Sequence, residues 1–108
     1  MRDKAAKQLL MAALLPFALL ALPAQAQESG QWGSGKNLYE KVCGQCHDPQ
    51  VGVGTAIAGR GLPEAYVKFI VRNGFNAMPA FPASFIDDES IAQVTEYLAS
   101  LPAAAGQP

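Results

Sequence analysis

Histidine, cysteine and methionine are scarce in this chain of 108 residues. It contains one His, two Cys and three Met, and two of the Met residues, Met1 and Met11, lie near its beginning. With a single histidine, a metal centre held by two histidines of one molecule is excluded. A structural zinc site takes about four ligands, commonly from a second Cys or Cys/His pair, and this sequence has no such second pair.

Basic residues are not in excess, and no hydrophobic run reaches the length of a membrane span. From residue 27 onward the chain has five basic and eight acidic residues, which gives a formal charge of −3. This balance argues against nucleic-acid binding, because that function calls for a basic face. The apolar run at 9–22 has about 14 residues, fewer than the roughly 20 that cross a bilayer.

The first 26 residues predict a cleaved export signal. Three basic residues precede the apolar run, and small residues follow at 24–26, where a signal peptidase reads the chain. We expect cleavage after Ala26, which leaves residues 27–108 as one domain without a membrane span. The alternative is that the segment stays uncleaved as a membrane anchor.

The run Cys43-Gly44-Gln45-Cys46-His47 carries the most specific chemistry in the chain. C-x-x-C-H is the attachment motif of a c-type haem, in which two thiols add to the haem vinyl groups and the adjacent imidazole binds the iron. A bare C-x-x-C also occurs in redox dithiols, zinc sites and disulfides. A thioredoxin-like dithiol follows a strand in a βαβ pattern, which is not visible here. The adjacent histidine and the export signal favour haem, which is attached outside the cytoplasm, so we expect a periplasmic protein.

Met78 is the candidate for a second axial ligand of the iron. It is the one Met after residue 26, and Pro79 behind it disfavours helical backbone. His/Met ligation raises the reduction potential of the iron, and two protein ligands leave no open position for oxygen. This favours electron transfer over a haem enzyme or a gas sensor. The alternative is that Met78 fills an irregular gap in the core, with five-coordinate iron.

Helix signals predict an all-α fold with three main helices around one covalent haem. We expect these helices over 35–42, 63–73 and 88–101, with Ser34 and Asp87 as the N-caps of the first and third. A small chain buries limited surface, and a covalently fixed haem supplies much of the missing core.

Between and beside the helices, the sequence predicts loops and loose ends. Residues 27–33 are expected to form a loose arm, and the tail at 102–108 is expected to fray. The Gly-rich loop at 48–61 is expected to approach a flat ligand closely. On the second helix we expect one apolar stripe, formed by Leu62, Tyr66, Phe69 and Ile70. It can pack on protein side chains and on the haem, because the haem is part of the expected core.

Together these residues resemble the class I c-type cytochromes. Gly35, Tyr39 and Tyr97 match the Gly and aromatic positions at which such folds cross their terminal helices. Residues 31–108 are similar, more closely, to the cytochrome c subunits of the 4-cresol dehydrogenase (p-cresol methylhydroxylase) flavocytochromes. The similar runs include GRGLPEAY at 59–66 and AMPAFPAS at 77–84.

The resemblance implies that Cys43 and Cys46 bind haem c covalently, while His47 and Met78 are the axial ligands. It implies that the chain alone is not an enzyme. It would accept single electrons from the covalent FAD of a separate subunit that oxidises a 4-alkylphenol, in an α2β2 assembly. A soluble blue-copper protein or another cytochrome would then accept the electrons. Many relatives have Pro at the position of Thr55, near the carbonyl that accepts the ligand His N–H, so we expect a less rigid hold on His47.

The neighbours of Met78 form a candidate partner interface, which consists of Ala77, Pro79, Ala80 and Phe81. Residues 74–86 have almost no charge, which is typical of the centre of a lasting interface. Shuttle proteins instead surround their redox centre with charges that steer brief encounters. A free-standing periplasmic shuttle cytochrome is the alternative function, and packing of Phe81 and Phe85 on the porphyrin is the alternative role for these rings.

Overall fold

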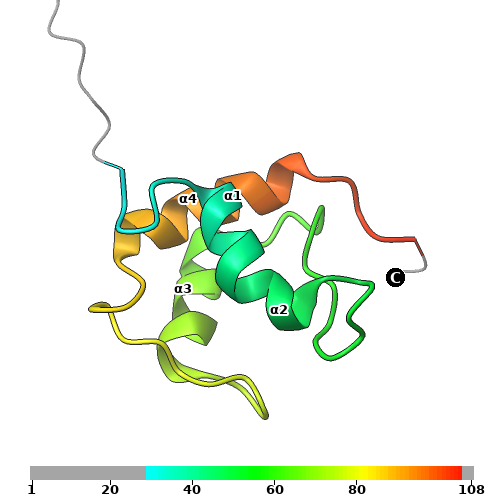
Figure 1. The fold of residues 1–108 in the computed structure, drawn as a ribbon, viewed down its shortest axis with the longest axis horizontal. Coiled ribbons are helices and arrows are strands. Elements are labelled where there is room, and N and C mark those ends of the chain that lie inside the picture. The colour runs from blue at the N-terminus through cyan, green and yellow to red at the C-terminus, as the bar shows by residue number, and fades with distance from the viewer. Residues whose placement is uncertain (1–28, 106–108) are drawn as a thin grey trace, which may run out of the picture.

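The computed structural model describes residues 29–105 and builds them mainly from helices (Figure 1). One helical stretch begins with α1 (Gly35–Leu38), passes through a π-helical turn η1 (Tyr39–Cys43) and ends with α2 (Gly44–His47). Two further helices follow, α3 (Glu64–Asn73) and α4 (Asp88–Ser100). The all-α prediction is therefore confirmed for these residues. The expected export signal lies outside the described range, and no helix within that range is long and apolar enough to cross a membrane.

The first helical stretch is longer than the sequence predicts, because it continues past residue 42 to His47. Glycine is a weak helix former. The sequence pattern therefore does not predict that the helix continues through Gly44. Gly44 is buried, and a Cβ atom there would lie 2.9 Å from the Tyr39 carbonyl oxygen. The π-helical turn thus needs glycine at this position, and the helix carries the whole motif.

Both predicted N-caps are confirmed. The Ser34 hydroxyl accepts a hydrogen bond from the Asn37 N–H at 3.1 Å. The Asp87 carboxylate accepts one from the Ser90 N–H at 2.9 Å. Each cap satisfies a backbone donor that the first helical turn would otherwise leave without a partner.

The first helical stretch crosses α4 at very short range (Figure 1). A Cβ atom on Gly35 would overlap the Gln93 carbonyl and lie 2.8 Å from the Val94 Cα. One turn further along, the rings of Tyr39 and Tyr97 lie 5.8 Å apart. Only glycine allows the two backbones to approach this closely, and the predicted crossing of these helices is confirmed.

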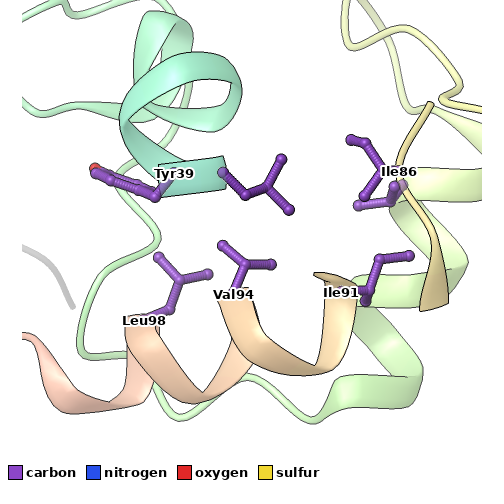
Figure 2. Close-up of a cluster of buried hydrophobic side chains, with 7 residues drawn as sticks. Tyr39, Ile86, Ile91, Val94 and Leu98 are labelled. Atoms are coloured by element: carbon purple, nitrogen blue, oxygen red, sulfur yellow. The ribbon is translucent and has the colours of Figure 1, made fainter. Parts of the chain in front are cut away.

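The core lies between α4 and the first helical stretch (Figure 2). From α4, Ile91, Val94 and Leu98 point toward Tyr39 and Ile86. This spacing places the three α4 side chains on one face of the helix. The buried cluster consists of Leu38, Tyr39, Val71, Ile86, Ile91, Val94 and Leu98.

The predicted stripe on α3 is not covered by the chain itself at Tyr66 and Phe69, which are 53% and 63% exposed. Val71 is buried and Val67 packs against the core, so these two valines make the contact of α3 with the protein's own core. Packing of the aromatic side chains on the haem stays a prediction.

The predicted loose arm is fixed to the start of α4 from Gly30 onward. Gly30 is buried, and the Gln31 N–H donates to the Asp87 carboxylate at 3.0 Å. The Trp32 N–H donates to the Ser90 hydroxyl at 3.3 Å. The Trp32 indole N–H donates to the Phe85 carbonyl at 2.8 Å. This segment is ordered by residues far away in the sequence.

In the Gly-rich loop at 48–61, Gly59 lies close to the backbone of the C-terminal segment. The Gly59 N–H donates to the Leu98 carbonyl at 2.8 Å. Gly59 has φ 68°, and a Cβ atom there would lie 2.7 Å from the Ala103 Cα. The beginning of the tail therefore packs against this loop, and its predicted fraying does not start at residue 102.

Replacement of Gly35 by Ala should destabilise the protein by about 1–3 kcal/mol, because the added methyl group overlaps the α4 backbone. Urea unfolding of the holoprotein measures this free energy. Lys36→Ala is the matched control at the next, exposed position, and its effect should stay within about 0.5 kcal/mol. Equal unfolding midpoints for the two variants would contradict the tight crossing.

Asp88 should make the stability depend on pH in acid. Hydrogen bonds from Lys68, and then Arg72, lower the pKa of Asp88 below its ordinary 3.8. A lowered folded-state pKa contributes stability above the unfolded-state pKa, and this contribution is lost as pH falls through the folded-state value. The stability difference between the wild type and Asp88→Asn should therefore shrink as pH falls below 3.8. Denaturant unfolding at several pH values measures it, with Glu89→Gln as the control, and a constant difference would refute this role.

Candidate haem site

The two motif cysteines lie one helical turn apart at the end of the first helical stretch. Cys43 ends η1 and Cys46 lies in α2. Residues three apart on a helix point to the same side. The Cys43 side chain is half-buried against the core cluster, whereas Cys46 is exposed. The pair thus presents two sulfurs along the edge of the core, as attachment to one porphyrin edge requires.

The surroundings of Cys43 differ from those of a redox-active dithiol. The two cysteines are free and form no disulfide with each other. Burial raises the pKa of the Cys43 thiol to about 11, whereas redox-active dithiols have a lowered pKa. Within residues 29–105, no group of three or more His, Cys, Asp and Glu side chains is placed to hold a metal ion.

The His47 ring is held by the backbone of the following loop. Its Nδ1 lies 2.7 Å from the Thr55 carbonyl oxygen. A carbonyl can only accept, so the proton of the neutral imidazole lies on Nδ1 and the lone pair on Nε2. The loop itself is fixed by a hydrogen bond from the Gly54 N–H to the Cys46 carbonyl at 2.7 Å. Although Thr55 replaces the proline of many relatives, its carbonyl makes the contact expected at that position.

Gly54 is required for this approach. A Cβ atom there would lie 2.9 Å from the His47 Nδ1 and 3.1 Å from the Cys46 carbonyl oxygen. The Gly-rich loop therefore comes close to the histidine ring, and this leaves Nε2 as the nitrogen that can bind iron.

Met78 is fixed in a tight turn that follows α3. Its backbone forms an antiparallel bridge with Phe75, with N–H to carbonyl distances of 3.1 and 2.9 Å. Gly74 and Asn76 have positive φ values of 71° and 51°, which glycine and asparagine tolerate best. The Met78 side chain is half-buried and packs against the core cluster. Its position is consistent with a core role as well as with ligation.

The structure brings Cys43 and Met78 onto the same core cluster, although they are far apart in the sequence. His47 is positioned by separate contacts from the loop behind it. One free imidazole nitrogen, one thioether and two thiols on one edge are the donor set of a His/Met haem c, and these residues fit that group.

Large apolar side chains are exposed on several segments of this structure. Their exposed fractions run from 45% for Phe85 to 73% for Val53. The full set consists of Val51, Val53, Tyr66, Phe69, Phe75 and Phe85. Several large apolar side chains left uncovered by the chain itself indicate a bound apolar group or a partner. Val51 and Val53 were not predicted as site residues, and their position directly after the motif was the available signal.

The candidate interface residues divide into two kinds. Ala77, Pro79 and Ala80 are exposed, as a partner surface requires. Phe81 is half-buried against the core, and its ring stacks on Phe85 at a centroid distance of 6.0 Å. Phe81 is thus mainly a support for the loop, beneath its exposed neighbours.

The fold and the motif define a small all-α c-type cytochrome. A family model described as "Cytochrome C oxidase, cbb3-type, subunit III" matches residues 30–98. The cytochrome c subunit of 4-cresol dehydrogenase [hydroxylating] from Pseudomonas putida is 67% identical over 102 residues, which cover 94% of this chain and 90% of that subunit.

Two crystal structures of p-cresol methylhydroxylase are also similar to this chain. The one with substrate bound has 77% identity and a TM-score of 0.67, and the match covers 68% of this chain and 99% of that chain. The one at 2.5 Å resolution has 76% identity and a TM-score of 0.66, over 67% and 99% of the two chains. The chain therefore belongs to the cytochrome c family, together with the cytochrome c subunit of 4-cresol dehydrogenase. It is an electron-transfer subunit and not an enzyme by itself.

Replacement of Gly54 by Ala should raise the reduction potential of the holoprotein. The added methyl group pushes the Thr55 carbonyl away from the His47 ring, and a weaker acceptor makes the imidazole a poorer donor to ferric iron. The expected rise is some tens of millivolts, since about 59 mV corresponds to a tenfold change in a one-electron equilibrium. Redox titration measures it, with exposed Gln50→Ala as the control. An unchanged potential would show that this contact does not tune the histidine.

Proposed function

We propose that this chain is a periplasmic haem c subunit, which carries single electrons from a flavoprotein dehydrogenase to a soluble acceptor. Cys43 and Cys46 hold one haem through thioether bonds, and His47 and Met78 bind its iron. The flavoprotein subunit carries covalent FAD and oxidises a 4-alkylphenol of the p-cresol type, in an α2β2 assembly. Residues 1–26 direct export and are removed.

The observation that carries this proposal is the fixed orientation of the His47 ring at the end of the first helical stretch. The Thr55 carbonyl fixes the His47 proton on Nδ1 and thereby directs Nε2 to the iron. When bound, haem c supplies an iron centre that gains and loses one electron. Cys43, Cys46, His47 and Met78 would hold that centre, and the core cluster that Cys43 and Met78 contact would keep water from it.

The flavoprotein partner is supported by the surface around Met78. Residues 74–86 contain no Lys, Arg, Asp or Glu. Within this segment Ala77, Pro79 and Ala80 are exposed, and Phe75 is 66% exposed. An uncharged, apolar and proline-stiffened loop is suited to a lasting interface, because little polar surface must be desolvated and little loop entropy is lost. The net negative charge of the domain then serves encounters with the soluble acceptor, a blue-copper protein or another cytochrome.

Met78→Ala should lower the reduction potential and open the iron to added ligands. Loss of the thioether removes the ligand that favours ferrous iron. The sulfur-to-iron charge-transfer band of the ferric wild type should disappear in the variant, while the haem stays attached. Visible spectroscopy and redox titration measure both effects. A wild-type potential and spin state in this variant would leave Met78 as a core residue only.

Ala80→Glu should weaken binding of the flavoprotein subunit by roughly tenfold or more, because it places an unpaired charge in the apolar centre of the interface. Ala99→Glu on α4 is the matched control, since it adds the same charge at another exposed position. Titration of the flavoprotein subunit with each variant measures the affinity. If both variants bind like the wild type, or if the wild-type chain purifies alone from its source, the free shuttle cytochrome is the better explanation.

A further inference from the structure

One charged side chain holds the otherwise uncharged loop that carries Met78. Arg72, near the end of α3, donates from Nη1 to the Phe81 carbonyl at 3.1 Å. It also donates from Nη2 to the Asp88 carboxylate at 2.7 Å. The Arg72 side chain is 21% exposed, whereas that of Asp88 is 60% exposed, so water screens the contact with the Phe81 carbonyl less than it screens the ion pair. The guanidinium thus links the loop to the first turn of α4.

Phe81 is held at both of its backbone groups by neighbouring residues of α3. Its N–H donates to the Val71 carbonyl at 2.8 Å, and its carbonyl accepts from Arg72. Met78, three residues earlier, is fixed by its bridge to Phe75. The Phe75–Met78 bridge keeps the turn closed, and Phe81 fixes the chain that follows it to α3. Displacement of Met78 is therefore opposed by the hold on Phe81.

Only an arginine can make both contacts in this way. Its planar group presents separate N–H donors in a fixed fork, whereas the lysine ammonium is a compact point charge. Lys68 also pairs with Asp88, at 2.5 Å. Within residues 29–105, Lys68 donates to Asp88 and no hydrogen bond joins it to Phe81. Lys68 therefore shares the ion pair with Arg72 but not the hold on the loop.

We propose that Arg72 is a positioning residue for the axial ligand, because its fork between the Phe81 carbonyl and Asp88 keeps the Met78 loop against α3. This inference rests on the proposed function, in which the Met78 thioether binds the iron. Arg72 touches neither the iron nor the thioether in this account. It acts by opposing the loop displacement through which Met78 would leave the iron.

Imidazole titration of the ferric holoprotein tests the proposal, because added imidazole binds only where Met78 has left. Loss of the sulfur-to-iron charge-transfer band reports the exchange. Arg72→Gln should lower the apparent Kd for imidazole about tenfold, since a charge-assisted hydrogen bond is typically worth at least one power of ten in such an equilibrium. Arg72→Lys should fall between this variant and the wild type, and Lys68→Gln should match the wild type. Helix content from circular dichroism shows that each variant is folded.

Each result bears on a separate claim. If Arg72→Gln and the wild type bind imidazole equally, or if Lys68→Gln changes the affinity as much as Arg72→Gln does, the positioning role is overturned. If Arg72→Gln does not accumulate as holoprotein, Arg72→Lys decides in its place, and a wild-type affinity refutes the proposal. If the wild type itself lacks the sulfur band, the Met78 assignment fails, and the role of Arg72 fails with it.

Discussion

The close crossing of the first helical stretch over α4 is the constraint on which the rest of this structure depends. At Gly35 the two backbones approach too closely for any side chain. This contact fixes the direction of the helix that ends in the haem motif, so the position of His47 follows from a contact three turns earlier. Ile91, Val94 and Leu98 then fill the angle between the helices, and burial of these apolar side chains stabilises the crossing.

The features that were predictable from the sequence depend on short-range chemistry. Ser34 and Asp87 cap helices through bonds to residues three positions away, and the α4 stripe follows from helical periodicity. The C-x-x-C-H motif and the later Met78 identify the candidate haem ligands by residue type alone. Likewise, the carbonyl that Thr55 offers to His47 is a backbone group, so its presence does not depend on which side chain the loop carries.

The features that could not be predicted depend on residues far apart in the chain. Trp32 is anchored by residues 53 and 58 positions later, and no local pattern records those partners. Which side chains of α3 meet the protein's own core depends on which helix covers which face, so Val71 is buried there while Tyr66 stays 53% exposed. From the sequence alone, Arg72 cannot be distinguished from an ordinary surface charge. Only the fold shows that it reaches both the Phe81 carbonyl and Asp88.

The anchoring of Gly30, Gln31 and Trp32 to the start of α4 has a consequence for biogenesis. Gln31 and Trp32 find partners at the start of the last helix and just before it, up to 58 positions later. Because synthesis delivers the chain from its N-terminal end, the domain cannot close while its C-terminal third is still inside the ribosome. The helix that carries Cys43 and Cys46 therefore cannot pack against α4 until the last third of the domain has left the ribosome.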